Sequence, residues 1–283
     1  MNNIELKNVT KKYPNFTLDK INMLVPQGAI VGLIGENGAG KTTLIKSILK
    51  IINIDDGTIN LLGQNNNQVS TKDDIGVVLD NSFFPEVLMP KDINKIMANI
   101  FPKWDEELFK KYLVAFKIPL DQQIKNLSKG MRKKLEIATA LAHKPKLLIL
   151  DEPTSGLDPI VRNEILDIFR DFIQDEEKSI LMSSHITSDL EHIADYIVFI
   201  NEGQIGFTED IETIHNQYGI AKCSNDDLKK ITNQDIIRIK KNKYSNDILT
   251  NDRKHFSKKY PQITVDKASI EDIMLLYVKG AQM

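Results

Sequence analysis

The sequence has 283 residues, of which 41% are hydrophobic and 27% charged, a composition typical of a water-soluble globular protein with one large domain or a large domain and a small one. The formal net charge of −2 gives no basic excess for binding phosphates, so we expect no nucleic acid as a major partner. The lone Cys223, the lack of a signal-peptide core and the lack of an apolar run of about 20 residues predict a chain in a reducing compartment that does not cross a membrane by itself.

The first predicted elements are two short strands. Apolar residues recur over residues 4–9 and 16–25, and residues 11–15 between them have the composition of a turn. This turn contains an exposed aromatic residue, Tyr13, directly before Pro14.

A phosphate-binding loop follows the apolar run at residues 30–34. Its glycines let successive backbone N–H groups converge on an anion, and the N-terminus of the helix predicted next adds a partial positive charge. In this G-x-x-x-x-G-K-[ST] pattern the lysine reaches the β- and γ-phosphates and the next hydroxyl binds Mg²⁺. The predicted contacts with a nucleoside triphosphate are Gly35, Glu36, Asn37, Gly38, Ala39, Gly40, Lys41, Thr42 and Thr43, with Thr42 also a ligand of Mg²⁺. Stacking on an adenine base and packing within the hairpin are equally compatible with Tyr13.

The middle of the chain contains predicted helices and strands and one segment interrupted by prolines. Residues 41–51 have helical apolar spacing, and residues 58–62 and 75–79 predict strands. Residues 81–90 are apolar but contain two prolines, which suits neither a central strand nor a helix interior. That segment either packs under a neighbour or awaits a partner. Residues 92–143 again have helical spacing and predict a helical insertion between two halves of a sheet.

Two carboxylates end the next apolar strand, at residues 146–152. In an open α/β sheet ligands bind at such strand ends, so we expect Asp151 to hold Mg²⁺ through its water shell and Glu152 to accept a proton from the attacking water. A further strand, residues 179–183, ends shortly before His185. That histidine is placed to stabilise charge on the γ-phosphate, although a capping or packing role would be the default for an isolated histidine.

The ordered set of motifs resembles the ATPase subunits of ABC transporters. It comprises residues 35–43, Leu127-Ser128-Lys129-Gly130-Met131, and residues 148–152 and 155–158 with His185, and the resemblance covers roughly residues 1–210. Within that family, Phe101-Pro102-Lys103-Trp104-Asp105, the SKGM form of the signature and Ser183-Ser184-His185 resemble subunits of Gram-positive bacterial exporters. Those include exporters of antimicrobial or amphipathic peptides such as phenol-soluble modulins.

The resemblance implies a site shared between two subunits. Ser128 and Gly130 would contact ATP held on the opposite subunit, and Asp158 would be a further nucleotide-contacting residue. From the sequence alone, Ser128 stands at the start of a helix that runs to Leu141, where a hydroxyl either addresses a phosphate or simply caps the helix. Two chains, identical or different, would close head to tail around two ATP molecules with Mg²⁺, and hydrolysis would let them part.

The sequence departs from the family pattern at two places. Asp80 stands where the family usually has glutamine, and a carboxylate only accepts hydrogen bonds. Either Asp80 or Asn81 would hold a water bound to Mg²⁺. Lys129 and Met131 replace the glycine and glutamine of the commonest signature and leave Ser128 and Gly130 in place.

The family resemblance fades after Gln204. Residues 236–240 alternate like a strand, residues 251–260 are polar and basic, and residues 269–272 open a final amphipathic helix that ends near Gly280. The predicted fold class is α/β: a P-loop NTPase core of the ABC ATPase type with a mixed sheet. Residues 1–215 would form the ATP-binding domain, with a helical subdomain at about 85–145, and residues 216–283 a small α+β appendage.

The function that the resemblance implies is ATP hydrolysis that drives export through separate transmembrane permease subunits. The chain would lie at the cytoplasmic face of the cell membrane, held there by those subunits. The alternatives are a soluble ABC ATPase without a transport role, disfavoured because the chain has one cassette and no long coiled coil, and a non-hydrolysing nucleotide switch, disfavoured by Glu152.

Overall fold

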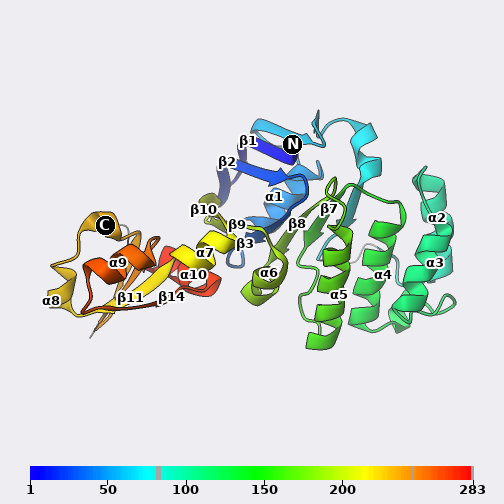
Figure 1. Ribbon diagram of the computed structural model, residues 1–283. Coiled ribbons are helices and arrows are strands. Elements are labelled where there is room, and N and C mark those ends of the chain that lie inside the picture. The colour runs from blue at the N-terminus through cyan, green and yellow to red at the C-terminus, as the bar shows by residue number, and fades with distance from the viewer. Residues whose placement is uncertain (81–83, 244, 282–283) are drawn as a thin grey trace.

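The computed structural model describes residues 1–80, 84–243 and 245–281. Figure 1 shows a larger part on the right, built from sheets and their helices, and a smaller C-terminal part on the left. The chain enters the smaller part after α7 (Ile211–Gln217) and returns to the larger part with its last helix, α10 (Ile270–Lys279).

In the described part of the chain, the central sheet has six strands in the order β10-β9-β3-β8-β7-β6. All its neighbouring pairs are parallel except β10 and β9, so the sheet is mixed, as the sequence predicts. Its middle strands are continuous apolar runs because parallel strands are covered on both faces. The bounds are Ile30–Ile34 (β3), Ile75–Val78 (β6), Leu147–Asp151 (β7), Ser179–Ser184 (β8), Tyr196–Asn201 (β9) and Gln204–Asp210 (β10).

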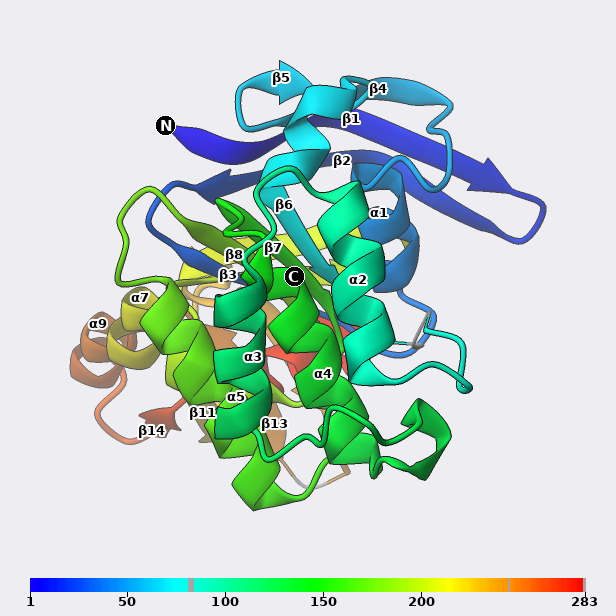
Figure 2. The same cartoon turned by 90° about the vertical axis from the view of Figure 1, so that its right-hand side faces the viewer.

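A second sheet, in the order β2-β1-β4-β5, lies above the central sheet in Figure 2. Its inward side chains, such as Ile4 and Leu6, share one core with helix α1 and one face of the central sheet. The ladder between β1 and β2 continues to the pair Tyr13–Phe16, so the turn is shorter than the predicted residues 11–15. The bounds are Asn2–Tyr13 (β1), Phe16–Pro26 (β2), Lys41–Ile48 (α1), Asp56–Leu61 (β4), Gln64–Asn65 (β5) and Val69–Asp74 for a 3₁₀ helix, η1.

Helices cover the other face of the central sheet. α4 (Lys129–Ala142), α5 (Pro159–Phe172) and α6 (Thr187–Ile193) contribute to a core with β-strand side chains such as Leu148, Met182 and Phe199. Because adjacent residues of a strand point to opposite faces, Leu147 and Leu148 pack into different cores.

The predicted helical insertion lies in front in Figure 2 and consists of α2 (Pro90–Ile100), α3 (Glu106–Ala115), the 3₁₀ turn η2 (Ile124–Asn126) and α4. Phe109, Leu113 and Leu135 centre its own core, against which Phe84 and Leu88 of the proline-containing segment pack. Those two side chains therefore lie partly under a neighbour. Residues 81–83 fall outside the described residues, and the predicted limits of this subdomain, about 85–145, stay a prediction.

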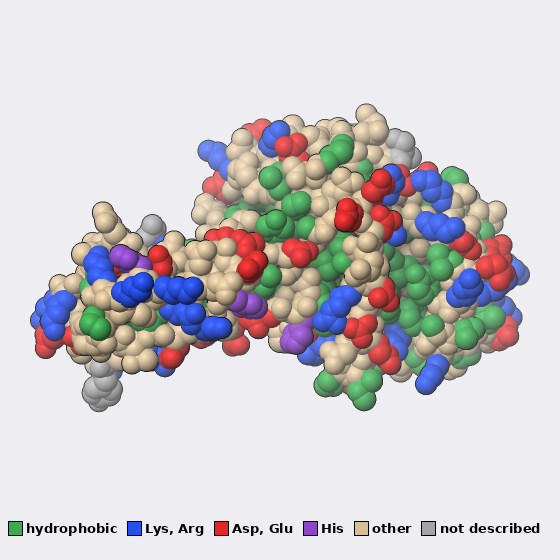
Figure 3. Space-filling view, viewed as in Figure 1, with side chains coloured by type: hydrophobic (Ala, Val, Ile, Leu, Met, Phe, Trp, Pro, Cys, Tyr) green, Lys and Arg blue, Asp and Glu red, His purple; other side chains and the backbone are tan. Residues whose placement is uncertain are grey.

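The C-terminal part contains a further sheet in the order β12-β13-β11-β14. Its elements are Gly219–Cys223 (β11), Asn225–Leu228 (α8), the 3₁₀ turn Asn233–Asp235 (η3), Arg238–Lys241 (β12), Asn246–Thr250 (β13), Arg253–Lys259 (α9), Thr264–Lys267 (β14) and α10. Cys223 is buried in it, and burial raises the pKa of its thiol, so this cysteine packs rather than reacts. Figure 3 shows Lys and Arg side chains gathered over α9, in the stretch that the sequence marks as basic.

Helix α10 joins the C-terminal part to the larger part. Its residues Ile270, Ile273 and Leu276 are buried in the same core as Leu190 and Phe199. The backbone N–H of Ile270 donates to Glu191 at 3.0 Å, which fixes the start of α10 beside α6. The core therefore continues across the predicted boundary between residues 215 and 216, which stays a prediction. No helix among the described residues has the length and apolar character needed to span a membrane.

Candidate functional site

The phosphate-binding loop connects β3 to α1 and is shaped by its glycines. Gly38 and Gly40 have φ values of 85° and 115°, in the left-handed region that favours glycine. A Cβ at Gly40 would lie 2.8 Å from side-chain atoms of Phe16 and Leu18. Any larger residue at that position would be strained by the positive φ and would push aside the ends of those two side chains.

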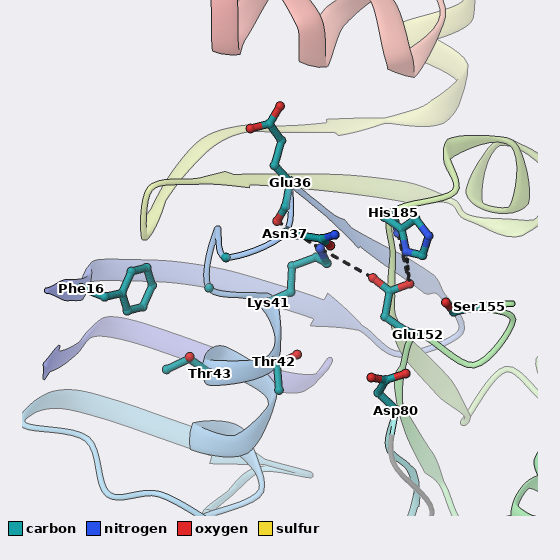
Figure 4. A pocket seen from close by; sticks show the side chains of 12 residues that line it. Phe16, Glu36, Asn37, Lys41, Thr42, Thr43, Asp80, Glu152, Ser155 and His185 are labelled. Atoms are coloured by element: carbon teal, nitrogen blue, oxygen red, sulfur yellow. Dashed lines mark hydrogen bonds and ion pairs between the residues drawn. The ribbon is translucent and has the colours of Figure 1, made fainter.

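Lys41 is the first residue of α1 and is only 6% exposed. Its Nζ donates to the carbonyl oxygens of Gly35 at 2.7 Å and Glu36 at 3.3 Å, and it lies 3.6 Å from Oε1 of Glu152. Figure 4 shows the ammonium between the loop and Glu152. The ammonium is thus held between the loop and the end of β7, where two loop carbonyls accept two of its three N–H donors.

A buried hydrogen-bond chain sets the position of Asp151. Its Oδ2 accepts from Thr42 Oγ1 at 2.9 Å, and its Oδ1 accepts from Ser183 Oγ at 2.5 Å. A hydroxyl and a carboxylate oxygen are hard donors of the kind that Mg²⁺ takes together with phosphate oxygens and waters. Among the described residues no group of three or more His, Cys, Asp or Glu side chains forms a metal cluster. Thr42 and Asp151 therefore suit a Mg²⁺ ion whose remaining ligands would come from a bound nucleotide and from water.

Glu152 directly follows β7 with a φ of 50°, a conformation that costs energy for a residue with a side chain. Its backbone N–H donates to Ser183 Oγ at 3.0 Å. Its Oε2 lies 2.6 Å from Nδ1 of His185 and accepts from the backbone N–H of His185 at 3.3 Å. The turn thus directs the carboxylate toward Lys41 on one side and His185 on the other, as Figure 4 shows.

Lys41, Thr42, Glu152 and His185 line a cavity of about 600 Å³, within the range of ligand pockets, whereas Asp151 and Ser183 are buried behind its wall. Its wall brings together residues from the loop, the two strand ends and the turn after β7. They are Phe16, Glu36, Asn37, Gly38, Gly40, Lys41, Thr42, Thr43, Asp80, Glu152, Ser155 and His185. Of the remaining residues of the predicted loop, Gly35 and Ala39 are buried beneath it.

The structure brings Phe16, and not Tyr13, to the wall of this cavity. Tyr13 is 43% exposed at the hairpin end, with Lys11 Nζ 5.5 Å from its ring centroid. Phe16 shares a strand face with the buried Leu18 because side chains alternate along a strand. That alternation was a sequence signal that would have favoured Phe16.

Asp80 is exposed on the cavity wall below Glu152 in Figure 4. Just before it, the carbonyl of Leu79 accepts from Lys133 Nζ at 3.0 Å, and Lys133 is also 2.9 Å from Glu136 Oε2. Both charged side chains are largely buried, so α4, the helix that follows the signature, is tied to the strand end that carries Asp80. The alternative ligand Asn81 lies outside the described residues.

Three predicted nucleotide contacts lie away from the wall of this cavity. Ser128 caps α4 by accepting from the N–H of Met131 at 3.2 Å, and it is exposed. Gly130 is in the first turn of α4, and Asp158 caps α5 by accepting from the N–H groups of Ile160 and Val161. Within one chain these residues do not join Lys41, which is the arrangement expected if they act on a second subunit.

Comparisons with known proteins identify the family of this chain. A family model described as ABC transporter matches residues 18–155. The bacitracin transport ATP-binding protein BcrA of Enterococcus faecalis is 35% identical over 219 residues, covering 76% of this chain and 71% of that protein. The lantibiotic transport ATP-binding protein SrtF of Streptococcus pyogenes is 34% identical over 75% of this chain and 93% of that protein.

Solved structures of ABC transporter ATP-binding subunits have the same fold. A structure titled as the ATP-binding subunit of an ABC transporter matches 75% of this chain and 91% of its own, with a TM-score of 0.69 and 25% identity. The resemblance predicted from the ordered motifs is confirmed, and so is the P-loop NTPase fold of the ABC ATPase type. The chain belongs to the family of ABC transporter ATP-binding proteins.

Proposed function

We propose that this protein is the ATP-hydrolysing subunit of a bacterial exporter, and that it acts at the cytoplasmic face of the membrane on separate transmembrane permease subunits. The observation that carries the enzymatic part is the contact of Glu152 with both Lys41 and His185 at the mouth of the cavity. This contact supports the proposal, because a carboxylate, an ammonium and an imidazole then surround the space proposed for the γ-phosphate.

In the proposed reaction ATP lies with its phosphates over the loop. The Lys41 ammonium exchanges the carbonyls of Gly35 and Glu36 for phosphate oxygens, and α1 adds its N-terminal dipole. Mg²⁺, when bound, neutralises charge on the β- and γ-phosphates. Thr42 and Asp151 would hold it, with Asp80 reaching it through a water.

Glu152 is the proposed general base. Its carboxylate accepts a proton from the water that attacks the γ-phosphorus, while the positive φ at Glu152 keeps that carboxylate at the end of β7. Because Nδ1 of His185 faces Glu152, Nε2 is the nitrogen left for a γ-phosphate oxygen. Ser128, Gly130 and Asp158 complete the site from a facing copy, identical or different.

Phe16 is the proposed platform for the base, in place of Tyr13. Replacing Phe16 with Ala is expected to weaken ATP binding about tenfold, because base–aromatic stacking contributes ~1–3 kcal/mol. The measurement is titration with a fluorescent ATP analogue, competed with ATP and with inorganic triphosphate. Triphosphate affinity stays unchanged, since the loop is intact. The matched control is Tyr13→Ala, for which ATP affinity is expected to equal that of the unchanged chain; the reverse result would restore Tyr13 as the platform.

The cargo is proposed to be an antimicrobial or amphipathic peptide. The support is the similarity to BcrA and SrtF, whose names assign them to bacitracin and lantibiotic transport. Purifying the complex from membranes and identifying the subunits that accompany this chain tests the transport role. Recovery without any membrane protein would favour a soluble ABC ATPase instead.

The proposed docking site for the permease is an apolar groove of about 240 Å³ between β6 and the helical insertion. Val77, at the sheet edge, is 37% exposed, and Phe84, Met97 and Phe101 line the opposite side. The exposed Ile100 of α2 extends the apolar surface. A short apolar segment of a membrane subunit fits such a groove. The sequence likewise makes residues 83–89, with the adjoining helical insertion, the candidate docking surface, because apolar residues there lie in a proline-broken loop. Phe83 lies outside the described residues.

Substituting Phe84 with Asp is expected to release the permease while leaving basal ATPase activity unchanged, because a carboxylate in the groove loses its hydration when the partner docks. Co-purification from membranes and ATPase assays of the isolated chain are the measurements. Val87→Asp, in the same segment but 65% exposed, is the matched control. Thermal midpoints of both variants separate loss of docking from loss of fold. A Phe84→Asp chain that is folded and still co-purifies in full would contradict the assignment.

A further inference from the structure

A second cavity, of about 460 Å³, opens beside the nucleotide cavity. Glu36 and His185 line both. The other walls are Ile186, Thr187 and Ser188 at the start of α6, and Glu271, Met274, Leu275 and Val278 of α10. The C-terminal part thus reaches the mouth of the nucleotide site, and Figure 4 shows its last helix directly above Glu36.

Helix α10 has a buried face and a second, partly exposed face. Ile270, Ile273 and Leu276 are buried in the core of the larger part, which fixes the helix in place. Met274 and Val278, four residues apart, pack partly against the same core and also line the second cavity. Leu275 lines that cavity beside them and is 40% exposed, so it is the apolar residue of α10 most open to a partner.

The proposed function determines what covers this second face. If Ser128 of a facing copy covers ATP at Lys41 and His185, the surface of that copy passes over His185 and Glu36. Those two residues are also walls of the second cavity, so the covering surface continues onto α10. The occupant is a second copy of this chain, because the chain carries both this recess and an apolar projection that fits it, and the inference rests on the proposed function with two identical copies.

The chain carries a suitable apolar projection beside its signature. Ile160 is 73% exposed in the first turn of α5. It directly precedes Val161, whose side chain would lie 3.3 Å from a Cβ at Gly130. A single exposed isoleucine is ordinary on a protein surface. Here, however, a facing copy that brings its signature to ATP brings Ile160 with it. In a two-fold dimer each copy supplies one projection and one recess, so each recess receives the projection of the other copy.

Charge complements the apolar fit. The rim of the recess has Glu36 and Glu271, both exposed. The signature that must approach it from the facing copy carries the exposed Lys129 next to Ser128. Opposite charges at the rim steer the two copies into the register that covers ATP.

We propose that α10 is part of the ATP-dependent dimer interface, with its recess of Met274, Leu275 and Val278 receiving Ile160 of the facing copy. The C-terminal part then sets how tightly the two copies close on ATP. Its contribution is separate from nucleotide binding, since Ile160 and Leu275 do not line the nucleotide cavity.

The test uses the full-length chain carrying Glu152→Gln, which is expected to accumulate as a dimer with ATP. Adding Ile160→Asp or Leu275→Asp is expected to raise the dimer dissociation constant at saturating ATP at least about tenfold, measured by sedimentation. ATP affinity of the dilute monomer stays within about twofold. Val114→Asp, 79% exposed on α3, is the control and leaves the dimer unchanged. Combining Ile160→Asp with Leu275→Lys restores dimerisation by pairing opposite charges.

A direct readout is a disulfide between copies. Ile160→Cys and Leu275→Cys in the same chain are expected to cross-link two copies under mild oxidation with ATP and not without it. The native Cys223 is buried and gives little background. Dimers that form equally well in the Asp variants, without an ATP-dependent cross-link, overturn the role of α10 and leave the proposed function standing. A Glu152→Gln chain that stays monomeric with ATP overturns both.

Discussion

Replacing Glu152 with Gln is expected to lower the rate of ATP hydrolysis by about 10²- to 10⁴-fold, the range for loss of a general base. The amide keeps the size of the side chain but accepts no proton from water. Lys41 and the loop still hold the phosphates, so ATP binds and is not consumed. Steady-state phosphate release measures the rate, and size-exclusion chromatography with Mg²⁺ and ATP shows the trapped dimer.

The matched control is Glu107→Gln, an exposed carboxylate on α3 that pairs only with Lys110 among the described contacts. Its hydrolysis rate is expected to equal that of the unchanged chain. A Glu152→Gln chain that hydrolyses ATP at the normal rate would remove Glu152 from the reaction. The base would then have to be sought elsewhere on the cavity wall, first at Asp80.

Mixing two inactive variants is expected to restore activity. Lys41→Met removes the cation that binds ATP, and Ser128→Arg places a bulky side chain where the facing copy must close. Each variant alone has two defective sites in every dimer. A mixed dimer has one site with Lys41 from one copy and Ser128 from the other, so random pairing in an equal mixture restores about a quarter of the normal rate.

The control for this rescue is a mixture of Lys41→Met with the double variant Lys41→Met, Ser128→Arg, in which no site has a lysine. That mixture is expected to stay inactive. Full activity of Ser128→Arg by itself would contradict the shared site, and so would full hydrolysis by a chain that sediments as a monomer. Both outcomes would leave Ser128 with the role that the structure shows directly, which is to cap α4.

The residues of the central site could be predicted from the sequence because each belongs to a short local motif. The loop conformation depends on Gly38 and Gly40, a few bonds from Lys41, and a buried strand must end where Asp151 and Glu152 begin. Parallel strands β3, β7 and β8 bring their carboxyl ends to one edge of the sheet. Thr42 and Asp151, which are 109 positions apart, therefore meet because each follows or ends a parallel strand at the same edge of the sheet.

The C-terminal part was harder to predict because its strands are short and their partners are distant. Residues 236–240 gave a strand signal, while β11 and β14, which pair Gly219 with Lys267, gave none that stood out. Propensity is weak for strands of four or five residues, and packing against neighbours decides their state. The amphipathic pattern of α10 predicted a helix, but not the surface on which its faces would lie.

By itself the sequence determined which groups the site would contain: a phosphate loop, carboxylates at a strand end and a histidine beyond the next strand. Those features depend on residue types and on backbone conformations set by near neighbours. That the signature acts on a second subunit was predicted only through the family resemblance. Only the tertiary structure decided that Phe16 rather than Tyr13 faces the nucleotide cavity, that Lys133 ties the signature helix to the strand end before Asp80, and that α10 returns to the mouth of the site. These features depend on which surfaces pack together between segments that are far apart in the chain. The free energy of that packing comes from apolar burial shared by many residues, and no local sequence pattern determines it.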